Sequence, residues 1–151
     1  MPQAPKTDEE ILVHESRIAV PYSWSAGETG SRFLKALRDE RKILANRCPA
    51  CRRVFVPPCK SCGSCFQACE EWLEVGPRGT LLSFTQALYE SPIHPGPRPV
   101  YGLIRLDGAD TAFLHRLEAG LAELRIGMTV EAVFAESRNA SILDIDHFEL
   151  V

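Results

Sequence analysis

The spacing of apolar positions divides this chain into regions that predict different structures. Residues 1–26 hold scattered charges, prolines and one short apolar piece, which predicts an irregular arm. From residue 28 to about residue 45, apolar side chains such as Phe33 and Leu37 recur at helical spacing with charged residues between them. This pattern predicts an amphipathic helix.

After residue 71 the spacing changes to that of short strands rich in apolar and β-branched residues, separated by turn signals. The expected strands cover residues 72–75, 79–89, 100–106, 111–117, 129–135 and 142–150. A short helix is expected at 118–125, ending before Gly127. About five strands, with a helix between the third and the fourth, predict an OB-type Greek-key barrel.

The six cysteines lie together between the predicted helix and the predicted barrel: Cys48, Cys51, Cys59, Cys62, Cys65 and Cys69. In a reducing cytosol, clustered cysteines are more often metal ligands than disulfides. Cys48 and Cys51 form one C-x₂-C pair, and Cys62 and Cys65 form another. Two such pairs predict a tetrahedral zinc ribbon, a closed site that contributes folding energy and no catalysis.

Cys59 and Cys69 leave two alternatives to this zinc site. Cys59 can replace Cys62 or Cys65 as a ligand, and the run from Cys59 to Cys69 has the spacing of a bacterial ferredoxin cluster. Glu70 stands where that motif has proline, and no second run is present. Redox-active cysteines are the other alternative. We favour zinc because only this assignment uses both pairs.

The predicted organisation is therefore a mainly β chain with an N-terminal helix, a zinc ribbon and a C-terminal OB-fold Greek-key barrel. The expected boundaries are residues 1–45 for the arm and helix, 46–71 for the ribbon and 72–151 for the barrel. The 151 residues carry a formal charge of −3, which disfavours nucleic acid and anionic membranes as partners. No run reaches the roughly 20 apolar residues of a membrane span, and the acidic N-terminus is not a secretory signal, so we expect a cytoplasmic protein.

Few residues outside the cysteine cluster suggest chemistry. The sequence has no G-x-S-x-G, Walker, G-x-G-x-x-G or H-E-x-x-H motif, and no cysteine outside the cluster to serve as a nucleophile. A proline-rich loop at 91–99 cannot be a central strand and is expected to project. It holds His94 and Arg98, with Tyr101 close by, as candidate ligand contacts; the alternative is an ordinary exposed loop.

Several motifs, in this order, resemble the DUF35 family, whose members join a rubredoxin-like zinc ribbon to an OB-fold and associate with acyl-CoA enzymes. The resemblance covers about residues 30–148. The motifs are Arg47-Cys48-x₂-Cys51, Pro57-Pro58, Cys62-x₂-Cys65, Glu71-Trp72, Gly79-Thr80-x₂-Ser83-Phe84-Thr85 and Ile126-Gly127-Met128-x-Val130-Glu131.

The resemblance implies a ligand set. Aligning the proline pair and Trp72 with the family assigns the metal ligands as Cys48, Cys51, Cys62 and Cys65. It leaves Cys59 where the family usually has arginine, and Cys69 in a variable stretch. Arg52 and Phe66 stand where glycine, which tolerates a left-handed backbone, often follows each pair.

The resemblance also implies a partner. Such proteins accompany thiolase-fold catalytic subunits, including thiolases, steroid side-chain aldolases and benzoylsuccinyl-CoA thiolase, commonly with two copies of each chain. Their barrel helps to shape the channel for the acyl-CoA, here with His94, Arg98 and Tyr101, and the chain alone is expected to be inactive. Tyr22, Trp24 and Phe33 are expected at the interface with the partner, although the rings of Tyr22 and Trp24 can instead pack on the chain's own helix.

Two other functions compete with this one. OB-folds and zinc ribbons also bind nucleic acid, and the local run Arg47, Arg52, Arg53 and Lys60 is basic. An iron–sulfur cluster would instead make the chain an electron-transfer protein.

Overall fold

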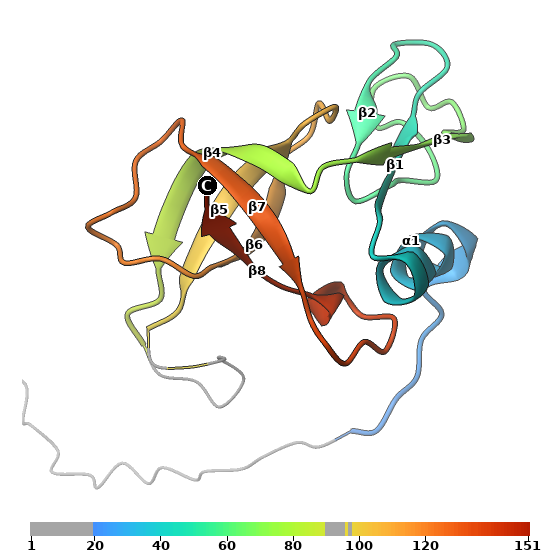
Figure 1. Cartoon of the computed structure of the whole chain (residues 1–151). Coiled ribbons are helices and arrows are strands. Elements are labelled where there is room, and N and C mark those ends of the chain that lie inside the picture. Colours follow the sequence, from blue (N-terminus) through green and yellow to red (C-terminus); the bar gives the residue numbers. More distant parts are fainter. Residues whose placement is uncertain (1–19, 90–95, 97) are drawn as a thin grey trace, which may run out of the picture.

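The computed structural model describes residues 20–89, 96 and 98–151. In this part of the chain, one helix and a three-stranded sheet lie beside a closed barrel (Figure 1). The elements are α1 (Gly27–Glu40), β1 (Ile43–Arg47), β2 (Val54–Phe55), β3 (Glu71–Val75), β4 (Arg78–Gln86), β5 (Val100–Leu106), β6 (Phe113–Leu117), β7 (Thr129–Phe134), the 3₁₀ turn η1 (Ile142–Asp144) and β8 (Ile145–Leu150).

Helix α1 buries one face of its amphipathic pattern, with Phe33 and Leu37 in the core. It ends earlier than predicted, because Arg41 adopts a left-handed conformation with φ of 55° and its N–H bonds to the carbonyl of Ala36. The apolar residues at 43–45 therefore belong to β1 and not to the helix. A short apolar run fits both the helical spacing and the spacing of a buried strand. Here the pairing of β1 with a strand on each side decides the outcome.

The three-stranded sheet has the order β2-β1-β3, with both neighbours antiparallel to β1. Strand β1 pairs along its whole length with β3, from Ile43 opposite Val75 to Arg47 opposite Glu71. Strand β3 then leads through residues 76 and 77 into β4 of the barrel. All six cysteines lie between β1 and β3, so this sheet positions them.

The barrel has the strand order β4-β5-β6-β8-β7 and closes through pairing of β4 with β7. Strand β6 runs parallel to β8 at Leu117 opposite Phe148, and the other described pairs in the barrel are antiparallel. The predicted mainly β fold with an OB-like barrel is confirmed.

The helix predicted at 118–125 is wrong, because residues 118–128 form turns. Leu124 is fully buried there, and the Arg125 guanidinium donates to the carbonyls of Ala122 and Leu124. The apolar spacing of this segment therefore reflects the burial of Leu124 in the core, without a regular helix.

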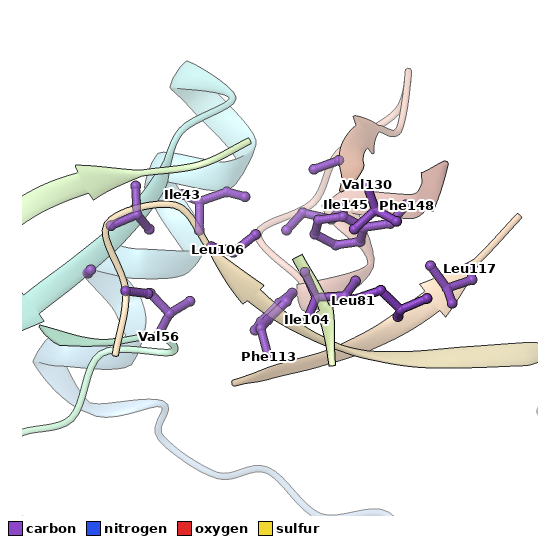
Figure 2. Packing of buried hydrophobic residues seen from close by; sticks show 14 of the residues in the cluster. Ile43, Val56, Leu81, Ile104, Leu106, Phe113, Leu117, Val130, Ile145 and Phe148 are labelled. Carbon is purple, nitrogen blue, oxygen red and sulfur yellow. The ribbon is translucent and has the colours of Figure 1, made fainter. Parts of the chain in front are cut away.

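One hydrophobic cluster extends from the barrel to the three-stranded sheet (Figure 2). Barrel residues such as Leu81, Ile104 and Phe148 are fully buried, and the cluster continues through Leu106 to Ile43 of β1. Gly102 allows one close approach: a Cβ at this position would lie 2.7 Å from Leu117 Cδ1.

Hydrogen bonds hold the sheet and the barrel together at the turn between β5 and β6. The Val54 N–H donates to Asp110 Oδ2 at 2.8 Å, and the Asp110 N–H donates to the Val54 carbonyl at 3.0 Å. The Val56 N–H donates to Thr111 Oγ1 at 2.8 Å. On another side, Arg138 Nε donates to the Arg38 carbonyl of α1 at 2.8 Å. The cysteine-bearing sheet is therefore anchored to the barrel.

Candidate metal centre

Each C-x₂-C pair forms a tight hairpin turn, and the two turns have the same hydrogen bonds. In the first, the Arg52 N–H donates to the Cys48 carbonyl and the Cys48 N–H donates to the Arg53 carbonyl, both at 3.0 Å. In the second, the equivalent bonds join Phe66 to Cys62 and Cys62 to the Gln67 carbonyl, both at 2.9 Å.

The residue after each pair is left-handed, with φ of 63° at Arg52 and 56° at Phe66. Glycine would adopt this conformation without strain, and each of these side chains adopts it at a cost of roughly 1 kcal/mol. Replacing glycine at these two positions therefore strains the turns without preventing them.

The turns bring together the sulfur atoms of Cys48, Cys51, Cys62 and Cys65, all within 4.8 Å of one another. Cys51 Sγ and Cys62 Sγ are 3.8 Å apart. Four thiolates about 2.3 Å from a tetrahedral metal would be separated by about 3.8 Å, so the donor set fits a four-coordinate ion. Cys48 and Cys62 are buried, whereas Cys51 is exposed.

Local hydrogen bonds distribute charge unevenly over these sulfurs. The backbone N–H groups of Cys65 and Ser64 lower the pKa of Cys62 to about 7, and the N–H of Cys51 lowers the pKa of Cys48. The hydrogen bond with Cys51, together with burial, raises the pKa of Cys65 to about 12. Four thiolates therefore coexist here only when a cation offsets part of their negative charge, as a divalent metal would.

Cys59 and Cys69 lie outside the group of four, with their Sγ atoms 3.9 Å apart. The ferredoxin-like run is thereby divided, because Cys62 and Cys65 lie with Cys48 and Cys51 instead. An iron–sulfur site built on Cys59, Cys62, Cys65 and Cys69 has no support in the described residues.

Asn46 organises the segments around the second pair, and the sequence analysis missed it. Its side chain is fully buried; Nδ2 donates to the carbonyls of Cys59 at 2.6 Å and Cys69 at 2.8 Å. Its Oδ1 accepts from the Cys59 N–H at 3.1 Å. The sequence carried no signal for this role, because no strand was predicted at 43–47 and Asn46 lies in β1.

The residues predicted at a partner interface separate into two groups. Tyr22 and Trp24 are 81% and 74% exposed, so they do not pack on α1. Phe33 is only 3% exposed and belongs to the hydrophobic core, so we do not retain it as a contact for a partner.

The predicted channel residues are not brought into one pocket by the described structure. His94 lies outside the described residues. Arg98 is exposed, and its side chain makes no ion pair with a described residue; it lines a cavity of about 490 Å³ with Gln86 and Arg116. Tyr101 lies in β5 and lines a different groove, also of about 490 Å³.

The groove at Tyr101 belongs to an apolar surface on the outside of the barrel. We define the leucine face by its members, namely Tyr101, Leu103, Leu114, Ile142 and Leu143. Leu103 of β5 lies opposite Leu114 of β6, and Leu114 and Leu143 are 64% and 69% exposed. Outward positions of an antiparallel barrel are normally polar, so this surface is suited to contact with another protein.

Comparison with known proteins supports this architecture. Residues 72–135 match the family model described as ChsH2, C-terminal OB-fold domain. The resemblance to the DUF35 family is confirmed. A DUF35 protein of unknown function from Sulfolobus solfataricus has the same fold, with a TM-score of 0.63 and 20% identity over 83% of this chain and 87% of that protein.

A second structure with the DUF35 fold is a chain of the Ltp2–ChsH2(DUF35) aldolase. It has a TM-score of 0.59 and 22% identity, over 89% of this chain and 98% of that chain. None of the curated proteins matches the sequence.

The basic residues of the ribbon give weak support for nucleic-acid binding. Arg47 and Arg52 both form ion pairs with Glu71, which leaves less positive charge for phosphates. The helix in the described part of the chain is too short and too polar to cross a membrane.

Proposed function

We propose that this chain is a zinc-binding, non-catalytic accessory subunit of a cytoplasmic, thiolase-fold acyl-CoA enzyme of degradative metabolism. The main observation behind this proposal is the leucine face on a barrel whose fold recurs in the Ltp2–ChsH2(DUF35) aldolase. An exposed apolar surface on a barrel is stabilised when a partner covers it.

Zinc has a structural role in this proposal. Cys48, Cys51, Cys62 and Cys65 would hold it, and four thiolates leave no coordination position for a substrate. A bound zinc ion would offset part of the negative charge of these thiolates and would connect the two turns. A tetrathiolate site can also hold iron, so a colourless protein with stoichiometric zinc is the expected preparation.

The catalytic subunit would contact two surfaces. The leucine face would form the apolar centre of the interface, and the exposed rings of Tyr22 and Trp24 would add contacts of a type enriched at interfaces. Two copies of each chain would form the complex, because thiolase-fold subunits are commonly dimers.

The acyl-CoA would bind where the two subunits meet. Arg98 has a guanidinium free of ion pairs with the described residues, which suits the phosphates of coenzyme A. Tyr101 belongs to the leucine face and would line the acyl channel, with His94 on the neighbouring loop.

Co-expression with the thiolase-fold protein encoded nearest to this chain tests the proposal. We expect a complex that cleaves or forms a carbon–carbon bond in an acyl-CoA, while this chain alone is inactive. Leu143→Asp should dissociate the complex, because it places a charge in the apolar centre. Ile126→Asp is the matched control, since Ile126 is 70% exposed but lies outside the leucine face.

Arg98→Ala should weaken acyl-CoA use while the complex stays assembled. Thioester turnover by the isolated chain would contradict the accessory role. A complex that tolerates Leu143→Asp as well as Ile126→Asp would exclude the leucine face as the interface.

A further inference from the structure

Two of the six cysteines have no role in the metal centre, yet the fold brings them together. Cys59 Sγ and Cys69 Sγ are 3.9 Å apart, beyond the bonding distance of about 2.05 Å for a disulfide but close enough for a small side-chain rotation to join them. The segments between them pair as a hairpin, with a bridge between Ser61 and Ala68.

Asn46 fixes the backbone at both cysteines. Its amide binds the carbonyls of Cys59 and Cys69 simultaneously, and its oxygen accepts the N–H of Cys59. A fully buried side chain with three hydrogen bonds keeps the two segments in register. Their proximity is therefore built into the ribbon.

We propose that Cys59 and Cys69 are an oxidisable dithiol that forms an intramolecular disulfide while the four metal ligands stay coordinated. The oxidant would be a hydroperoxide. The Cys59 thiolate attacks one peroxide oxygen; the S–O bond forms, the O–O bond breaks, and Cys59 becomes a sulfenic acid. The leaving alkoxide or hydroxide takes up the proton that the Cys59 thiol gave to solvent, and departs as an alcohol or water. The Cys69 sulfur then attacks Cys59 Sγ; the S–S bond forms, the S–O bond breaks, and the hydroxide leaves as water with the Cys69 proton. The two sulfurs together lose two electrons, and the peroxide gains them.

Access and coordination make this pair the selective site. Cys59 is partly exposed, and Cys69 lines a groove of about 280 Å³ beside Arg32 and Lys60. The four ligand thiolates would be bound to the metal and would therefore be poorer nucleophiles. The disulfide would close the loop that carries the second C-x₂-C pair and would restrain this turn when the metal is released.

The test uses the full chain loaded with zinc and treated with hydrogen peroxide. Trypsin cleavage after Lys60 separates Cys59, in the peptide 54–60, from Cys69, in the peptide 61–78. In a non-reducing digest we expect these two peptides to be linked, with a mass two hydrogens below the sum of their separate masses. The intact oxidised protein should keep its zinc. After denaturation and chelation, the alkylatable thiols should fall from six to four.

Single variants identify the partner cysteine, because the peptide 61–78 also contains Cys62 and Cys65. Cys69→Ser and Cys59→Ser should each abolish the link and still bind one zinc. If either serine variant loses zinc, two other measurements take its place. One is the same digest on Cys69→Ala, and the other is mass mapping of the disulfide in the wild-type protein. A link that persists in Cys69→Ser, zinc release during oxidation, or six alkylatable thiols after peroxide would each overturn the proposal. None of these results depends on an acyl-CoA partner.

Discussion

The barrel and the ribbon of this chain are stabilised by different physics. The barrel buries large apolar side chains from its strands, including Leu81, Ile104 and Phe148 (Figure 2). We call the two C-x₂-C turns and the residues beside them the tip of the ribbon. The second cluster of buried residues lies there and consists of Cys48, Cys62 and Cys69. So few apolar atoms cannot offset the entropy of ordering two turns, whereas bonds to a metal can.

The two regions are nevertheless continuous at the base of the ribbon. Val54 and Val56 belong to the main hydrophobic cluster, and both donate backbone hydrogen bonds to the turn between β5 and β6. The comparison therefore predicts that loss of the metal unfolds the tip of the ribbon and leaves its base attached to the barrel.

Removal of the metal ligand Cys48 should have the largest effect. Structural zinc binding contributes about 10–16 kcal/mol in small zinc modules at neutral pH, and Cys48→Ser removes one of four bonds. We expect loss of stoichiometric metal by elemental analysis. Hydrogen exchange should show lost amide protection in the two C-x₂-C turns, at 48–52 and 62–67, with protection retained at Val54, at Val56 and in the barrel.

Cys59→Ser is the control for this variant, because Cys59 lies outside the four-sulfur group. It should retain the metal. If Cys48→Ser kept full metal content, or if its barrel lost protection together with the ribbon tip, the division into two stabilising mechanisms would fail.

Truncation of the barrel core should have the next largest effect. Phe148 is fully buried and contacts Phe113 edge to face, with ring centroids 6.2 Å apart. Phe148→Ala should destabilise the fold by about 3–5 kcal/mol, measured by denaturant unfolding. An exposed apolar residue, Ile126→Ala, should change stability by less than about 0.5 kcal/mol. Equal effects of the two substitutions would contradict the assigned core.

The smallest effect concerns pH and His115 in the barrel. Its Nε2 donates to the Ile142 carbonyl at 3.3 Å, and its buried Nδ1 has no partner among the described residues. Burial lowers the pKa of His115 below the usual value of 6.5. The unfolded chain therefore takes up a proton first, so stability is complete above about pH 6.5 and falls as the pH drops from there toward the folded pKa.

His115→Phe should flatten this part of the curve of unfolding free energy against pH, since phenylalanine can stack between Phe113 and Phe148 without titrating. His147→Gln, at a less buried position, is the control. An unchanged slope below pH 6.5 in His115→Phe would show that other groups cause the acid sensitivity.

Much of the fold was predictable because local patterns and tertiary structure agree. The alternation in β5 and β6 places Ile104 and Phe113 inward, as the period of two predicts. The predictions failed where one pattern satisfies two structures. Residues 43–45 continue a helical period but pair as β1, and the segment around Leu124 has helical spacing but forms turns.

The sequence by itself determined the two C-x₂-C turns, because a chelating pair is a local property of four residues. It also determined the approximate strands of the barrel. Only the tertiary structure decided which cysteines share a centre, how Asn46 pairs Cys59 with Cys69, and that leucines gather on the outside of the barrel. These relations join residues that are distant in sequence, and their distances depend on strand register and closure, which no local pattern specifies.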